Sequence, residues 1–194
     1  MEINTPDRLP DLSREAQDAL LRVARASIAA ALRGEAYVPP EGLPPPCEQP
    51  GAVFVSLHAD GDLRGCIGMV RTLAPLAGVV AHCARAAALE DPRFPPLGAE
   101  DLAHVDIEIS VLGETRPLPP GVLPRPGVDG VVVSRSGRQG LLLPQVATEQ
   151  GWDGKRLLEE TCVKAGLERE AWAHGARAEI FQARVFSEEN PRTI

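Results

Sequence analysis

Residues 52–69 read AVFVSLHADGDLRGCIGM, two runs rich in β-branched and apolar residues around the pair Asp60-Gly61. An Asp-Gly pair adopts the positive φ angles that a two-residue hairpin turn needs. The sequence therefore predicts a β-hairpin whose strands cover residues 52–59 and 62–69. This hairpin indicates that the surrounding fold is built on an antiparallel sheet.

The register of this hairpin decides which residues share a face with Cys66. With a two-residue turn and regular pairing, Cys66 lies opposite Val55, and its thiol shares an aliphatic face with Leu57 and Arg64. His58 then points to the opposite face. We therefore expect an aliphatic environment for the thiol and no nucleophile–base pair between Cys66 and His58.

The glycines around Cys66, in the hexapeptide LRGCIG at residues 63–68, allow two interpretations. Gly65 and Gly68 could leave the backbone open to a substrate, with Arg64 as a nearby cation for a reactive thiolate. Alternatively, the glycines let a helix pack closely on the strand, and Cys66 fills a small gap. We favour the structural interpretation because no base is evident, and we keep a nucleophilic or redox thiol as the alternative.

Apolar periodicity and turn residues predict the remaining elements. Apolar residues spaced three and four apart predict helices, and period-two alternation predicts strands. The predicted helices run from the N-cap Ser13 to residue 32 before Gly34, from Pro75 to before Pro92, and over residues 155–165. The further predicted strands cover residues 105–112, 130–134, 139–143 and 178–186. This order predicts an α+β fold, with mainly antiparallel sheets and flanking helices.

One proline-rich segment interrupts these elements. Residues 38–51 contain six prolines, which exclude a helix or a central strand. We expect an exposed, extended loop there that carries Cys47.

The composition is that of a globular protein without a general affinity for polyanions. The chain has 194 residues, 44% of them hydrophobic and 24% charged, with a formal net charge of −7. A negative charge disfavours binding to nucleic acids and anionic membranes. The first residues lack the features of a signal peptide, and no apolar run is long enough to span a membrane. We expect a soluble, cytoplasmic protein.

Candidate metal and catalytic residues are few. The four cysteines and four histidines lack the spacing of a zinc site, and nucleotide-binding and hydrolase motifs are absent. We therefore predict no metal and no cofactor. Asp106 and Glu108 share one face of the strand at residues 105–112 and could form an acid–base pair or bind a metal. We favour ion pairs with Arg64 or Arg93.

Two further segments contain candidate ligand-binding residues. The loop DPRFP at residues 91–95 combines an ion pair, which includes Arg93, with an aromatic ring, and such a loop can line a cleft. Gln145, in the sequence Leu143-Pro144-Gln145, could supply an amide to the same ligand.

Five segments occur together in a characteristic order. They are GDLRGCIGMV at residues 61–70, EDPRFPPL at 90–97, DIEISVL at 106–112, GLLLPQVATEQGWD at 140–153 and TCVKAGL at 161–167. In this order they resemble the AMMECR-one domain family, known in bacteria as AmmeMemoRadiSam system protein A. The resemblance implies one domain over residues 13–188 with a larger lobe from both chain ends and a smaller inserted lobe. Residues 1–12 and 189–194 are expected to be flexible ends.

The resemblance implies partners rather than a reaction. It implies a Memo-like protein and a radical SAM protein from the same system, and it carries over no established catalytic residue. Our leading hypothesis is an accessory or substrate-presenting component. It would bind a small molecule or a partner in an interlobe groove marked by Arg64, Cys66, Arg93 and Glu108. The alternative is an enzyme that uses Cys66 as a nucleophile or redox thiol.

Overall fold

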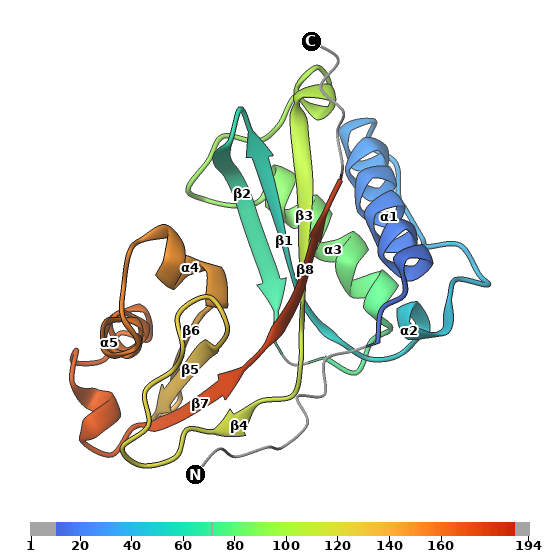
Figure 1. Ribbon diagram of the computed structural model, residues 1–194. Coiled ribbons are helices and arrows are strands. Elements are labelled where there is room, and N and C mark those ends of the chain that lie inside the picture. The colour runs from blue at the N-terminus through green and yellow to red at the C-terminus, as the bar shows by residue number, and fades with distance from the viewer. Residues whose placement is uncertain (1–10, 71, 189–194) are drawn as a thin grey trace. The chain divides into compact units, whose positions relative to one another are not determined.

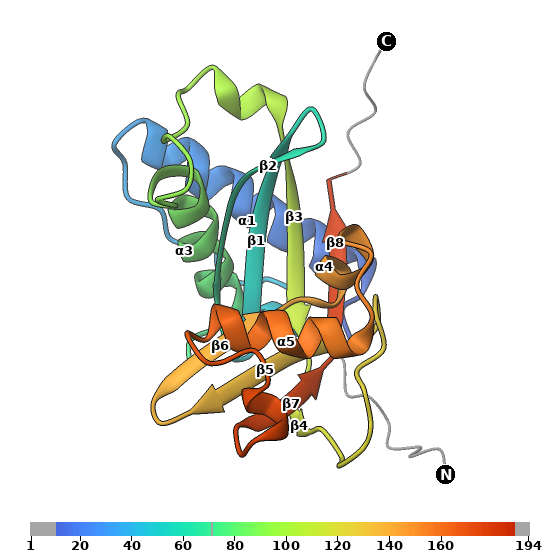
Figure 2. The same ribbon diagram turned by 90° about the vertical axis from the view of Figure 1, so that its left-hand side faces the viewer.

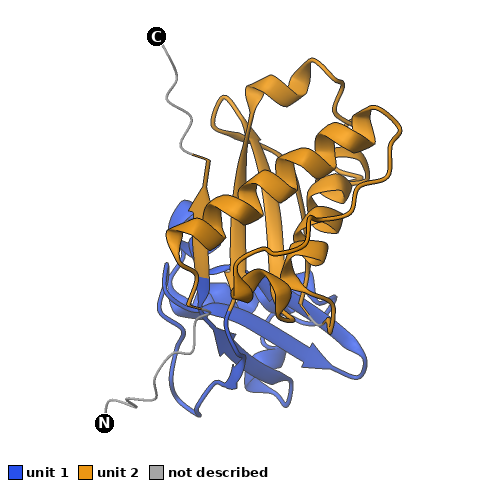
Figure 3. Ribbon diagram, turned by 90° about the vertical axis from the view of Figure 1, so that its right-hand side faces the viewer, with its two compact units in different colours: residues 1–9, 113–183 blue, residues 10–112, 184–194 orange. Residues whose placement is uncertain are grey.

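A computed structural model describes residues 11–70 and 72–188 of the chain. The chain divides into two compact units (Figure 3). The larger unit comprises residues 10–112 and 184–194, and the smaller unit comprises residues 1–9 and 113–183. Of the two expected flexible ends, only Asp11 and Leu12 are described. Leu12 is 4% exposed and belongs to the core.

The larger unit contains a four-stranded sheet with the strand order β2-β1-β3-β8 (Figure 1). Strand β1 pairs antiparallel with β2, as predicted for the hairpin, and it also pairs antiparallel with β3. Helices α1 and α3 pack against each other and cover one face of this sheet. The strands are β1 (Ala52–Ala59), β2 (Asp62–Met69), β3 (Val105–Leu112) and β8 (Ala183–Ser187). The helices are α1 (Arg14–Leu32), α2 (Pro45–Glu48), α3 (Leu76–Leu89) and the 3₁₀ helix η1 (Asp101–His104).

Strand alternation separates an apolar face from a polar face in this sheet. Val53, Val55 and Leu57 of β1 are fully buried in the core shared with the helices. The residues between them on β1, which include Ser56 and His58, point to the opposite face. Burial of the aliphatic side chains supplies most of the favourable free energy of folding, and the opposite face is left for polar side chains.

The first helix begins and ends at the predicted residues. The Ser13 hydroxyl accepts a hydrogen bond from the Ala16 amide at 3.3 Å, which satisfies one of the unpaired N–H groups of the first turn. Gly34 follows the helix with a φ of 73°, a left-handed conformation that glycine adopts without strain.

Ser13→Ala should lower the free energy of unfolding by about 1 kcal/mol, because the capping acceptor is lost. Ser13→Asp keeps an acceptor and places a negative charge at the helix N-terminus, so it should be as stable as the wild type. Urea unfolding followed by circular dichroism measures both changes. Equal midpoints for the alanine and aspartate variants would contradict the cap.

The β1–β2 hairpin is confirmed, but its predicted register is wrong. Asp60 and Gly61 have φ angles of 54° and 90°, as the two-residue turn requires. Ala59 pairs with Asp62 and His58 with Leu63, after which the register shifts by one residue. Arg64 is the extra residue of this β-bulge. Beyond the bulge, Leu57 pairs with Gly65 and Ser56 pairs with Cys66, so Cys66 faces away from the helices.

The proline-rich segment differs from the prediction at one place. Residues 45–48 form the single-turn helix α2, with prolines in its first turn, where no backbone N–H donor is needed. Cys47 lies on this turn and is fully buried. The predicted absence of a helix and the predicted exposure of Cys47 are therefore both wrong.

The smaller unit contains a second four-stranded antiparallel sheet, with the order β4-β7-β5-β6. Helix α5 packs on β5 and β6 (Figure 2). The predicted strand over residues 178–186 is two strands, β7 and β8, which belong to different sheets. The strands are β4 (Arg116–Pro117), β5 (Gly130–Arg135), β6 (Arg138–Leu142) and β7 (Arg177–Phe181). The helices are α4 (Pro144–Glu149), α5 (Gly154–Lys164) and the 3₁₀ helix η2 (Ala171–Ala173).

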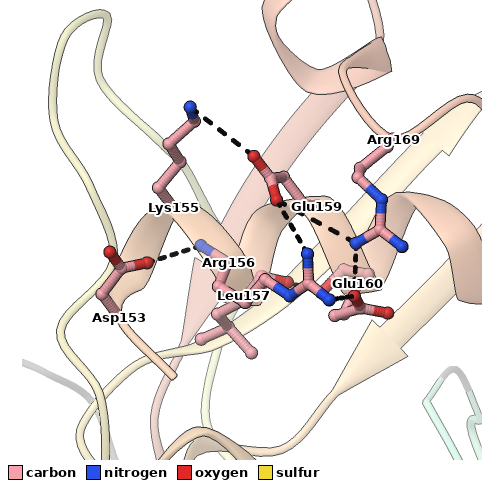
Figure 4. A network of polar contacts seen from close by, with 8 residues as sticks. Asp153, Lys155, Arg156, Leu157, Glu159, Glu160 and Arg169 are labelled. Atoms are coloured by element: carbon pink, nitrogen blue, oxygen red, sulfur yellow. Dashed lines mark hydrogen bonds and ion pairs between the residues drawn. The ribbon is translucent and has the colours of Figure 1, made fainter. Parts of the chain in front are cut away.

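A charged network covers the outer side of α5 (Figure 4). Asp153 caps the helix by accepting from the Arg156 amide at 2.7 Å. Arg156 also pairs with Glu160 at 2.8 Å, and Arg169 contacts the same carboxylate. Arg156 and Glu160 are four residues apart on the helix, and Arg169 joins the helix to the segment that follows it. These contacts account for the polar face of α5 structurally.

Candidate functional site

The bulge in β2 aligns three polar side chains in one row across the sheet. Ser56 lies directly between Cys66 on β2 and Glu108 on β3, and all three point away from the helices. The Ser56 hydroxyl donates a hydrogen bond to the Cys66 Sγ at 3.3 Å. The next row pairs His58 with Asp106. The predicted aliphatic surroundings of the thiol are therefore wrong, and Cys66 and His58 share a face.

A shared face does not bring His58 into contact with the thiol. The Cys66 Sγ accepts a hydrogen bond from Ser56, and the Arg93 guanidinium also interacts with the Cys66 side chain. Cys66 is partly exposed, whereas Cys47, Cys83 and Cys162 are fully buried. Burial raises the pKa of the Cys83 thiol to about 12. Cys66 is thus the cysteine whose side chain is accessible.

The main chain of Cys66 is held by the loop that follows α3. Cys66 lies on the edge strand β2, where backbone groups on one side lack a neighbouring strand. The Asp91 carboxylate accepts from the Cys66 N–H at 2.9 Å, and the Arg93 Nη2 donates to the Cys66 carbonyl at 3.1 Å. The two side chains together replace the missing strand at this residue.

Asp91 is the centre of this arrangement. Its side chain is 2% exposed, and the Arg93 guanidinium binds it through Nε at 2.9 Å and Nη2 at 2.6 Å. The guanidinium, and then the backbone N–H groups of Cys66 and Arg93, hold the pKa of the Asp91 carboxyl well below its usual range despite burial. In turn, Asp91 raises the pKa of Arg93, and the Cys66 side chain adds to this effect. The predicted ion pair in the loop is confirmed.

The arginines do not pair with the strand carboxylates as predicted. Arg93 binds Asp91, and the Arg64 Nη1 donates to the Pro95 carbonyl at 2.7 Å. Both arginines therefore attach β2 to the loop at residues 91–95. Asp106 and Glu108 both lie on β3, two strands further into the sheet from these contacts.

Two close approaches explain the glycines of the LRGCIG segment. A Cβ atom at Gly65 would lie 2.1 Å from the Ala87 carbonyl oxygen, because α3 packs directly on the strand. A Cβ atom at Gly68 would lie 2.3 Å from the ring of Phe54 on the opposite face. The helix-packing interpretation holds for Gly65, and Gly68 makes room for an aromatic ring. Neither glycine leaves backbone open beside Cys66.

The remaining predicted candidates divide between the units. Arg64, Gly65, Cys66, Gly68, Arg93 and Glu108 all belong to the larger unit, whereas Gln145 lies in α4 of the smaller unit. No group of three or more histidine, cysteine, aspartate or glutamate side chains within residues 11–70 and 72–188 is placed to hold a metal ion. In the same residues, no helix is long and apolar enough to cross a membrane.

A separate groove of about 550 Å³ lies along α1, lined by Arg14, Asp18, Arg22 and Arg25. Arg25 binds the Glu188 carboxylate and donates to the Leu102 and Val105 carbonyls, each at 2.8 Å. Its donors therefore join α1 to the residues around β3 and β8. This role is structural.

Two residues of the Cys66 site were not predicted. A regular register places Ser56 on the face opposite to Cys66, and a bulge leaves no clear mark in the sequence. Asp91 was assigned to an ion pair but not to the Cys66 backbone, since no local pattern indicates which strand edge a loop carboxylate will bind.

Comparisons with known proteins agree with the fold and identify the family. A protein of Methanothermobacter thermautotrophicus is 43% identical over 186 residues, covering 92% of this chain and 97% of that protein. A protein of Thermofilum pendens is 39% identical over 199 aligned residues, covering 93% of each. The crystal structure of the uncharacterized protein PH0010 from Pyrococcus horikoshii matches with a TM-score of 0.87 at 35% identity. That match covers 93% of this chain and 95% of PH0010.

The structural match confirms the predicted α+β fold with antiparallel sheets and flanking helices. The AMMECR1 family model matches residues 21–186, a range that includes the hairpin, the loop at residues 91–95 and both sheets. The chain therefore belongs to the AMMECR1 family, as its sequence segments indicated.

Proposed function

We propose that the polar face around Cys66 binds a small molecule or a segment of a partner protein. The chain then acts as an accessory or substrate-presenting component. The observation that supports this proposal is the row of Cys66, Ser56 and Glu108, with the backbone of Cys66 fixed by Asp91 and Arg93. Rigid placement of polar groups on a strand favours specific recognition because little ordering is required on binding.

The same geometry favours binding over catalysis by the thiol. A cysteine nucleophile in acyl transfer needs a base beside the sulfur and N–H donors for the developing oxyanion. The Cys66 Sγ contacts a serine hydroxyl rather than a base, and the Cys66 N–H already donates to Asp91. The hydroxyl that contacts the sulfur is therefore not a base, and the Cys66 N–H is already used within the fold.

A redox or alkylated thiol is the second candidate. The observations that favour it are the partial exposure of the Cys66 side chain and the Arg93 guanidinium, a cation that binds the Cys66 carbonyl. An enzyme of this kind should lose activity in Cys66→Ser while the variant unfolds with the same midpoint as the wild type. A binding component should keep its partners in that variant.

The resemblance to AmmeMemoRadiSam system protein A supports a Memo-like protein and a radical SAM protein as partners. We expect tagged wild-type chain and tagged Cys66→Ser to retain both proteins when the three are co-expressed from one genome. Size-exclusion chromatography with mass spectrometry measures the complexes. Migration of the tagged chain alone in both cases would count against the accessory role.

Iodoacetamide should alkylate Cys66 in the native protein, because its side chain is the partly exposed thiol of the four. Cys47, Cys83 and Cys162 are internal controls, and they should react only after unfolding in urea. Peptide mass spectrometry of timed samples gives each rate. If Cys66 is protected as fully as the other three, the surface cannot accept a ligand and the proposed function fails.

A further inference from the structure

The Arg93 guanidinium has donors that the fold does not use. A guanidinium carries five N–H donors, and here Nε and Nη2 bind Asp91 and the Cys66 carbonyl. For Nη1, the described part of the chain supplies no hydrogen-bond acceptor. The Arg93 side chain is 56% exposed and binds the Cys66 carbonyl, so the guanidinium is accessible next to Cys66.

The orientation of this guanidinium is fixed before any ligand binds. Asp91 accepts hydrogen bonds from two nitrogens of the guanidinium. The Arg93 Cζ lies 5.3 Å from the centre of the Phe94 ring, over its face. Pro92, between the two charged residues, restricts the backbone of the loop. A preset planar group loses less side-chain entropy per hydrogen bond formed than a mobile lysine would lose.

The charges are arranged so that a ligand meets the cation first. Asp91 is 2% exposed and lies behind the guanidinium, whereas Arg93 presents its outer edge. Glu108 is two strands away from the β2 edge, which corresponds to about 10 Å and is comparable to the screening length in physiological salt. The cation at the β2 edge is thus separated from the carboxylates of β3.

We propose that Arg93 binds the anionic group, a carboxylate in the simplest case, of the ligand that the Cys66 surface accepts. This inference rests on the proposed function and adds to it the chemical class of the ligand. It assigns Arg93 direct contact with the ligand through Nη1.

Two alkylating reagents of similar size test the proposal. Iodoacetate is an anion and iodoacetamide is neutral, and both react with the thiolate form of a cysteine. The rate with iodoacetate divided by the rate with iodoacetamide at Cys66 is therefore independent of the fraction of thiolate. The ratio should fall about threefold in Arg93→Gln, the size expected for one exposed charge pair. Arg93→Lys keeps the charge without the planar fork and should give an intermediate ratio. In the wild type, 0.5 M NaCl should lower the ratio.

Arg85→Gln is the matched control. Arg85 is also an exposed arginine near the end of α3, where it pairs with Glu90, so the same charge is removed away from the thiol. Its ratio should equal that of the wild type. If the ratio is unchanged in Arg93→Gln while Cys66 still reacts, the role of Arg93 is overturned and the proposed function is not. No native reaction of Cys66 with either reagent overturns the proposed function as well.

Discussion

Gly65→Ala is expected to lower the free energy of unfolding by about 3 kcal/mol, the upper part of the range for overpacking a core. The added Cβ would lie 2.1 Å from the carbonyl oxygen of Ala87, a backbone atom that cannot rotate away. Helix α3 must therefore move off strand β2, and buried contacts are lost along their interface. Urea unfolding followed by circular dichroism measures the change.

Gly78→Ala in α3 is the matched control for this substitution. A Cβ at Gly78 meets no atom within 4 Å, and alanine is a better helix former than glycine. The free energy of unfolding of this variant should be about 0.5–1 kcal/mol higher than that of the wild type. A stability of Gly65→Ala within 0.5 kcal/mol of the wild type would show that strand and helix separate easily, contrary to the close packing described here.

Asp91→Asn is expected to lower the free energy of unfolding by about 2 kcal/mol at neutral pH, because a buried, charge-assisted hydrogen-bond network loses its charge. The effect is smaller than for a fully buried pair because Arg93, the partner, is more than half exposed and partly screened by water. Asp18→Asn removes a carboxylate from an exposed pair with Arg14 and should change stability by less than 0.5 kcal/mol.

The difference in free energy of unfolding between the wild type and Asp91→Asn should shrink as the pH falls. Because the folded-state pKa of Asp91 is lowered, its ionised form stabilises the native state above the unfolded pKa of about 4. That contribution declines as the pH falls below about 4 and protons bind the unfolded chain first. Urea titrations at pH 7, 5, 4 and 3 should show the two proteins converging. A constant difference over this range would assign the effect to shape rather than to charge.

The architecture of the larger unit could be predicted because its signals are local. The Asp60-Gly61 turn, the Ser13 cap and the alternating strand at residues 105–112 each depend on a few adjacent residues, and the structure confirms all three. The ion pair of Asp91 and Arg93 is also local, since only Pro92 separates them along the chain.

The arrangement around Cys66 could not be predicted because it depends on contacts between distant segments. One bulged residue, Arg64, reverses the face of every residue that follows it in β2, and the bulge places Gly65 against the Ala87 carbonyl of α3. Burial of Cys47 likewise depends on α2 packing against α1, which the prolines alone do not indicate.

The position of β8 has a consequence for synthesis on the ribosome. A nascent chain that has emerged only to residue 182 contains α1, α3 and three strands of the larger sheet, but β3 still lacks its outer neighbour. An uncovered strand edge can pair with another nascent chain. The smaller unit is complete before β8 arrives, and the contact of Glu188 with Arg25 forms last. The order of translation therefore allows the smaller unit to fold before the final strand of the larger unit has been synthesised.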